Sequence, residues 1–152
     1  MGLKAISRLI KGAPDYESGI WTPTLGVTSG TDGVHTYSQQ VGYYERIGNL
    51  VWVSATLTVS ALDVSISGDI AIKGLPFANG IPDIGVEFVA SALSGVTINS
   101  GGGYLALTGT LRADAGDVAI RETGNNISRA NITNSDLASA CGFVITGVYR
   151  VA

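Results

Sequence analysis

The chain has 152 residues, of which 45% are hydrophobic and only 14% are charged, against about 25% charged residues in ordinary soluble domains. Its net charge of −3 at pH 7 argues against nucleic acid as the main partner, because binding to phosphates needs a basic surface. A single cysteine excludes a disulfide within the chain, and no run approaches the roughly 18 apolar residues of a membrane-spanning helix.

Residues 1–12 are predicted to form an amphipathic helical arm, followed by a linker at residues 13–19. Apolar side chains recur at helical spacing, basic side chains lie off that stripe, and Gly12 and Pro14 mark the stop. A helix this short is marginal in water, so it needs a surface to lie on. That surface is either its own domain, a partner or a symmetry mate, or a membrane surface, which the short length makes the weakest of the three. The stripe consists of Leu3, Ile6, Leu9 and Ile10.

Residues 20–152 are predicted to form one all-β domain, an antiparallel, jelly-roll-like β-sandwich. Short β-prone runs are separated by Gly, Asn, Asp and Ser, which is typical of sandwiches and barrels. Pro23 places the first strand at an edge or a bulge, and the C-terminal run is expected to be a central strand. Strands are expected near 20–28, 34–38, 41–47, 50–60, 68–74, 84–93, 103–112, 117–122 and 142–151.

The domain is organised around a hairpin at residues 42–59. A Gly-Asn pair between two β-prone runs indicates a two-residue turn, which sets Ile47 opposite Leu50. Alternation then gives a core face of Tyr44, Val51, Val53, Ala55, Leu57 and Val59. The second face is also apolar near the turn, and it needs a cover, either a loop or a neighbouring subunit. The candidate subunit-interface residues are Tyr43, Ile47, Leu50 and Trp52.

The sequence offers little support for an enzyme, and no cofactor or metal is expected. The only histidine, His35, has no second histidine with which to build a metal site. The only cysteine, Cys141, sits beside an apolar strand and is expected in the core. Two pairs of carboxylates, Asp63 with Asp69 and Asp114 with Asp117, fall in turn-like contexts, where aspartate is favoured for backbone reasons.

Aromatic side chains are the better functional lead, because sugar rings stack on exposed Trp and Tyr. For Trp21, Tyr43 and Trp52, packing in the core or at an interface is the favoured interpretation. Tyr104 follows three glycines and is expected to be exposed, so it is the candidate glycan contact.

Four pieces of sequence, taken together and in this order, resemble a known family. They are Gly19-x-Trp21-Thr22-Pro23, Gly42-x-Tyr44-x-x-Ile47-Gly48, Gly74-Leu75-Pro76-Phe77 and Gly147-x-Tyr149-Arg150. Over residues 19–152, the pattern resembles a β-sandwich module found at the tips of bacteriophage tail fibres and tailspikes and in small phage head or tail appendage proteins.

This resemblance implies a homotrimer on the surface of a virion that adheres to the host, often through surface polysaccharide. The N-terminal arm, through Leu3, Ile6, Leu9 and Ile10, would then contact other virion proteins or the trimer mates. It implies no catalysis, and the charge and the lack of a long apolar run leave no nucleic acid partner and no membrane insertion to expect. Two alternatives remain: a capsid decoration or cement protein without host contact, and a free carbohydrate-binding lectin.

Overall fold

The computed structural model describes residues 15–78, 86–112 and 116–151, and within these ranges the regular structure is almost entirely β. Two short 3-10 helices, Ser100–Gly102 and Asn134–Asp136, accompany the strands. The strands are β1 (Tyr16–Trp21), β2 (Thr24–Thr31), β3 (Thr36–Ile47), β4 (Leu50–Ala61), β5 (Ser67–Lys73), β6 (Val86–Val96), β7 (Tyr104–Leu111), β8 (Asp117–Gly124), β9 (Ala130–Asn131) and β10 (Leu137–Arg150). The predicted helical arm at 1–12 lies outside the described residues.

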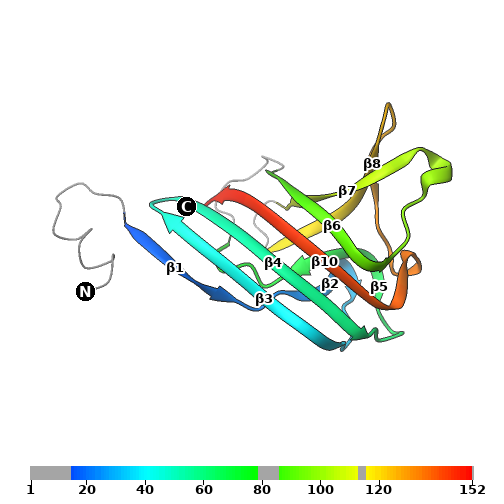
Figure 1. The fold of residues 1–152 in the computed structure, drawn as a ribbon, viewed down its shortest axis with the longest axis horizontal. Coiled ribbons are helices and arrows are strands. Elements are labelled where there is room, and N and C mark those ends of the chain that lie inside the picture. Colours follow the sequence, from blue (N-terminus) through cyan, green and yellow to red (C-terminus); the bar gives the residue numbers. More distant parts are fainter. Residues whose placement is uncertain (1–14, 79–85, 113–115, 152) are drawn as a thin grey trace.

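The strands pair antiparallel in one continuous sheet, in the order β1-β3-β4-β10-β6-β7-β8-β5-β2, with β9 beside β8. Figure 1 shows β3, β4, β10 and β6 side by side as a front layer, with β2 and β5 behind them. The all-β antiparallel prediction is confirmed. The two layers, however, belong to a single curled sheet, where the sequence pattern predicts a sandwich.

Both edges of this sheet come from neighbouring segments of the chain. β1 and β2 are the two edge strands, and only Thr22 and Pro23 separate them. Proline cannot donate a hydrogen bond to a strand ladder, so the predicted first strand at 20–28 breaks there into two. β1 also begins at Tyr16, inside the segment that is predicted to be linker, because residues 16–21 pair with β3.

The β3–β4 hairpin has the predicted register, with Ile47 opposite Leu50 and Glu45 opposite Trp52. The strands expected at 34–38 and 41–47 are one strand, β3, with register shifts between Thr36 and Gln39. β10 is central as predicted, because it pairs with β4 on one side and with β6 on the other.

The core lies between the layers and follows the two-residue alternation of the strands. Phe88, Cys141 and Phe143 are among the most buried side chains. The core face of the hairpin is confirmed for its β4 residues, which are Val51, Val53, Ala55, Leu57 and Val59, all buried.

Phe77, in the segment after β5, packs against one end of the core. Its ring meets that of Tyr44 edge-on at 5.2 Å between centroids, and the Arg46 guanidinium lies 4.9 Å from its centroid. The Tyr149 hydroxyl donates a hydrogen bond of 3.0 Å to the Phe77 carbonyl oxygen. These contacts fix the segment after β5 across the end of the front layer.

Candidate functional site

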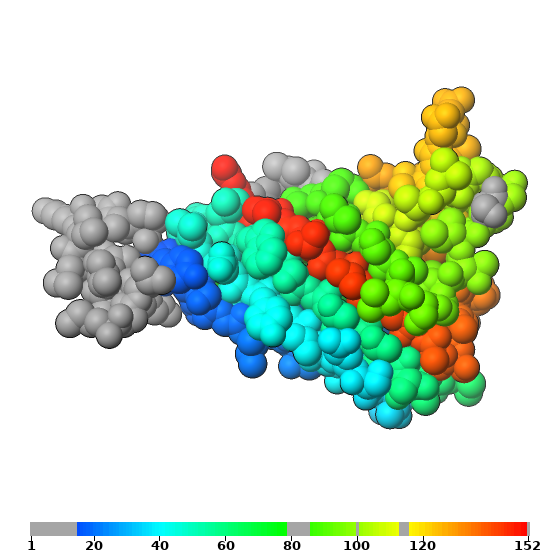
Figure 2. Space-filling model, in the orientation of Figure 1, coloured from blue at the N-terminus to red at the C-terminus, as the bar shows by residue number. Residues whose placement is uncertain are grey.

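The candidate site is the outer face, defined as the side of β1, β3, β4, β10 and β6 that points away from the core. Figure 2 shows this face over β3, β4, β10 and β6. Alternation along each strand puts the buried residues on one side and these residues on the other. Its exposed apolar side chains are Ile20, Val41, Tyr43, Ile47, Leu50, Trp52, Val89, Leu93 and Val148.

The register places these side chains in rows across the strands. One row crosses all five strands, from Ile20 on β1 to Val89 on β6, through Tyr43, Ser54 and Thr146. A second row sets Val148 beside Trp52 and Trp52 beside Glu45. A third sets Arg150 beside Leu50 and Leu50 beside Ile47. Apolar side chains therefore recur in every row, with Ser54, Thr146, Glu45 and Arg150 between or beside them.

The four candidate interface residues lie at the hairpin-tip end of this outer face. Tyr43, Ile47, Leu50 and Trp52 are 55, 52, 48 and 41% exposed within one chain. Large apolar side chains that stay this exposed next to one another mark contact surfaces. Sequence reasoning missed Ile20, Val41 and Leu93, although strands that are apolar on both faces were the signal that could have found them.

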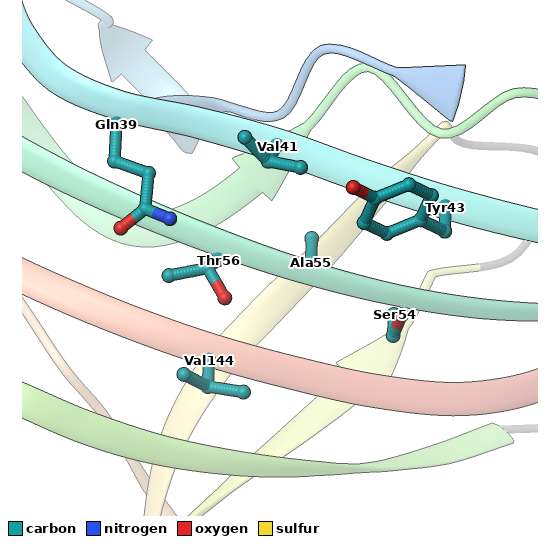
Figure 3. Close-up of a pocket in the computed structure, with 7 residues that line it drawn as sticks. All are labelled: Gln39, Val41, Tyr43, Ser54, Ala55, Thr56 and Val144. Carbon is teal, nitrogen blue, oxygen red and sulfur yellow. The ribbon is translucent and has the colours of Figure 1, made fainter.

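A hollow of about 350 Å³ lies in the outer face, between β3, β4 and β10 (Figure 3). Tyr43, Val41 and Gln39 line it from β3, and Val144 lines it from β10. Ser54, Ala55 and Thr56 form its β4 side. The lining carries no charged side chain, so the hollow suits apolar or neutral groups.

Tyr104, the candidate glycan contact, is half-buried rather than fully exposed. Its hydroxyl donates a hydrogen bond of 3.1 Å to the carbonyl oxygen of Ser128. The preceding Gly103 has φ of +88°, a conformation that favours glycine. Tyr104 thus ties the start of β7 to the loop after β8, and part of its surface stays open.

His35 and Asp63 are engaged with the backbone. The His35 Nδ1 atom accepts a hydrogen bond from the Asp63 amide, and the Asp63 carboxylate accepts from the amides of Val34 and Ser65. These backbone hydrogen bonds hold the pKa of Asp63 below its usual value. Both residues therefore shape the turn after β4.

Cys141 is fully buried, as predicted, and burial raises the pKa of its thiol to about 11. Asp69 accepts a hydrogen bond from the Asn131 side chain at 2.7 Å. Asp114 lies outside the described residues. In the described ranges no group of three or more His, Cys, Asp and Glu side chains could hold a metal ion. None of the helices described there could cross a membrane.

Two ion pairs lie where β2, β5 and β8 meet. Lys73 contacts Asp32 at 2.7 Å, and Arg112 contacts Asp117 at 3.3 Å. The hydrogen bond from Lys73 lowers the pKa of Asp32. Burial raises the pKa of Asp117 although Arg112 lies beside it. The pKa values of the two carboxylates are thus shifted in opposite directions, although both belong to one cluster of charged side chains.

Comparison with known proteins gives a match at the level of fold. The sequence matches no family model and no curated protein. Among solved structures, the crystal structure of the Dettilon tailspike protein is similar, with a TM-score of 0.69 and 22% sequence identity. The match covers 89% of this chain and 24% of that chain, so this chain spans about a quarter of the length of the tailspike chain.

Proposed function

We propose that this chain is a structural protein on the surface of a bacteriophage particle, a head or tail fibre or spike component. It assembles as a homotrimer through the outer face and is displayed for adhesion to the host, through surface glycans. The observation that carries this proposal is the group of large exposed apolar side chains on the outer face, above all Ile47, Leu50 and Trp52 at the hairpin tip. The fold likeness to a tailspike protein and the sequence resemblance support the assignment to a phage particle.

The outer face offers a patch that can form part of a contact between subunits. Four strand spacings of roughly 4.8 Å and six residues of roughly 3.3 Å give a footprint of about 20 Å by 20 Å. Apolar patches within a footprint of this size are often functional. Burying a large apolar side chain contributes about 1.5–3 kcal/mol, so covering Trp52, Leu50, Ile47 and Tyr43 would supply several kcal/mol.

Display as a trimer gives adhesion a physical basis. Three copies would present three Tyr104 rings together, and weak contacts to a repetitive surface add through effective concentration. Each Tyr104 ring offers a partly open aromatic surface, positioned by its hydrogen bond to Ser128.

The assembly is tested by native mass measurement at micromolar concentration. The wild-type chain is expected as a trimer, and the variant Leu50→Glu/Trp52→Glu as a monomer, since two buried unpaired carboxylates would be costly. Val64→Glu is the matched control, because Val64 is 98% exposed and lies on the loop after β4, away from the outer face. A wild-type chain that stays monomeric would overturn the proposal.

The adhesive role is tested by binding of the isolated protein to a glycan array. Binding that Tyr104→Ala weakens, with the trimer mass unchanged, supports adhesion through Tyr104. A capsid that loses heat resistance without the protein, together with no glycan binding, would establish a cement role instead. Purification of the protein free of particles, with glycan binding, would establish a lectin.

A further inference from the structure

We propose that residues 1–12 of one copy lie along the outer face of a second copy and fill its hollow with aliphatic side chains. This inference rests on the proposed function and names the segment that covers part of the interface. The segment belongs to this chain, so the occupant requires no other partner.

The hollow has the chemistry of an aliphatic binding groove. Val41 and Val144 supply apolar walls, the Tyr43 ring supplies a third, and Gln39 and Thr56 supply neutral polar groups. The arrangement in Figure 3 opens outward, away from the core. An amphipathic segment can place its apolar side chains inward here and leave its charges outside.

The N-terminal segment matches this groove in pattern and length. Leu3, Ile6, Leu9 and Ile10 recur at helical spacing, and twelve helical residues span about 18 Å. The outer face from Ile47 to Val41 spans about 20 Å along β3. One segment can therefore reach from the hairpin tip to the hollow.

The path of the chain directs the segment toward a second copy. The Asp15 carbonyl oxygen accepts a hydrogen bond of 2.8 Å from the Gly48 amide, so the segment begins at the hairpin tip. β1 points toward that tip when followed backward from Trp21. Ala13 precedes Pro14, and the residue before a proline favours extended backbone, so we expect the chain to continue along the line of β1 past the end of its own outer face.

Charge favours the same contact. The segment contains Lys4, Arg8 and Lys11 and no acidic residue, while the rest of the chain has six Lys and Arg against twelve Asp and Glu. On the outer face, Glu45 stands beside Trp52 and Arg150 stands beside Leu50. A basic segment on an acidic body is attracted to it at the distances of contact.

Cysteine trapping in the full chain tests the contact. Ile6→Cys and Leu9→Cys are each combined with Thr56→Cys, which lies in the hollow, and the native Cys141 stays buried and protonated. Oxidation is expected to give disulfide-linked oligomers on a non-reducing gel. Ser65→Cys replaces Thr56→Cys in the control, because Ser65 is exposed on the β4–β5 loop at the opposite end of the hairpin.

Three outcomes are distinguishable. Disulfides within single chains would overturn the inference, since the segment would then cover its own outer face. A trimer that forms no disulfide, and whose dissociation constant deletion of residues 1–12 leaves unchanged, would overturn the inference but spare the proposed function. A chain that is monomeric by native mass would overturn both. The inference itself expects the deletion to weaken assembly about tenfold or more, because it removes the four aliphatic side chains that would be buried in the contact.

Discussion

At the residue scale, glycines that face aromatic rings explain much of the packing. A Cβ added to Gly19 would collide with the Tyr44 side chain, and one added to Gly42 would collide with the Trp21 ring. A Cβ added to Gly147 would collide with the Phe88 ring. Three of the four pieces of sequence that resemble the phage module contain one of these glycines. Those pieces are therefore a packing pattern: each glycine makes room for a ring on the neighbouring strand.

Replacing Gly147 by alanine is expected to destabilise the fold by about 1–3 kcal/mol, the usual cost of overpacking. A Cβ there would lie 2.5 to 2.8 Å from three atoms of the Phe88 ring, and that ring is only 2% exposed. The measurement is urea unfolding. Gly116→Ala is the control, since nothing lies within 4 Å of its Cβ position, and an equal loss in both variants would contradict the packing argument.

The two carboxylates of the ion cluster predict opposite pH dependences. The pKa of Asp117 is raised in the fold, so its contribution to stability is present at acidic pH and is lost as the pH rises through that pKa. Asp117→Asn should therefore be at least as stable as wild type at pH 7, with an advantage that disappears near pH 3. Unfolding free energies at the two pH values measure this.

Asp32→Asn provides the matched contrast. The pKa of Asp32 is lowered by Lys73, so its contribution is present above its unfolded value of 3.8 and is lost as the pH falls through the folded pKa. This variant should be slightly less stable than wild type at pH 7 and equal to it at low pH. The effect is small because the pair is partly exposed. Curves of the same sign for both variants would contradict the assignment.

At the element scale, the β3–β4 turn depends on one residue of the Gly-Asn pair. Gly48 has φ of +58°, and Asn126 is the one described residue other than glycine with positive φ, so Asn49 does not share that conformation. Positive φ at the first turn position alone is typical of a type II′ turn. Gly48→Ala should cost about 1 kcal/mol, and Asn49→Ala less than about 0.5 kcal/mol, in thermal unfolding. A larger loss at Asn49 would contradict this turn type.

The hairpin was predictable from sequence because its information is local. A two-residue turn sets the register, and alternation then assigns Val51 and Val53 to the core and Trp52 to the outer face. Elements that depend on distant partners were not predictable in this way. β9 forms in a loop that is polar in sequence, because Asn131 and Ala130 meet β8. β3 contains two register shifts between Thr36 and Gln39. In the sequence pattern this region appears only as a break between two expected strands.

At the scale of the whole molecule, the sequence pattern indicates the fold class but not the order of the strands. The edge strands β1 and β2 are consecutive in the chain yet stand at opposite ends of the sheet order. Side chains of β3 connect it to β2 and the residue before it, although the two strands do not pair. The Tyr37 hydroxyl accepts a hydrogen bond from the Leu25 backbone amide, and the Gln40 side-chain amide donates one to the Pro23 carbonyl oxygen. The periodicity of apolar residues in the sequence does not indicate such contacts. The sequence therefore could not distinguish one curled sheet from two separate sheets that pack face to face.

The same reasoning explains why the candidate site was only partly predictable. The apolar hairpin tip, with Trp52 and Leu50, can be predicted from the sequence because large apolar side chains occur on both faces of the hairpin there. The full width of the outer face is not, since Ile20 and Val89 join it only through pairing across five strands. The extent of the outer face depends on the order of the strands in the sheet, and the local sequence pattern does not determine that order.

The proposed assembly through the outer face predicts that the stability of the chain depends on its concentration. If folding and trimer formation are linked, each tenfold rise in protein concentration favours the folded state by roughly 0.9 kcal/mol per chain. With an unfolding entropy of about 2.1 cal/mol/K per residue, a chain of 152 residues should gain about 3 °C in its thermal midpoint. Calorimetric scans at about 2, about 20 and about 200 µM would measure how the thermal midpoint changes with concentration. The Leu50→Glu/Trp52→Glu variant should show a midpoint independent of concentration, while Val64→Glu should keep the wild-type slope. A flat wild-type midpoint would mean that one chain is stable with its outer face uncovered, and the link between that face and assembly would be lost.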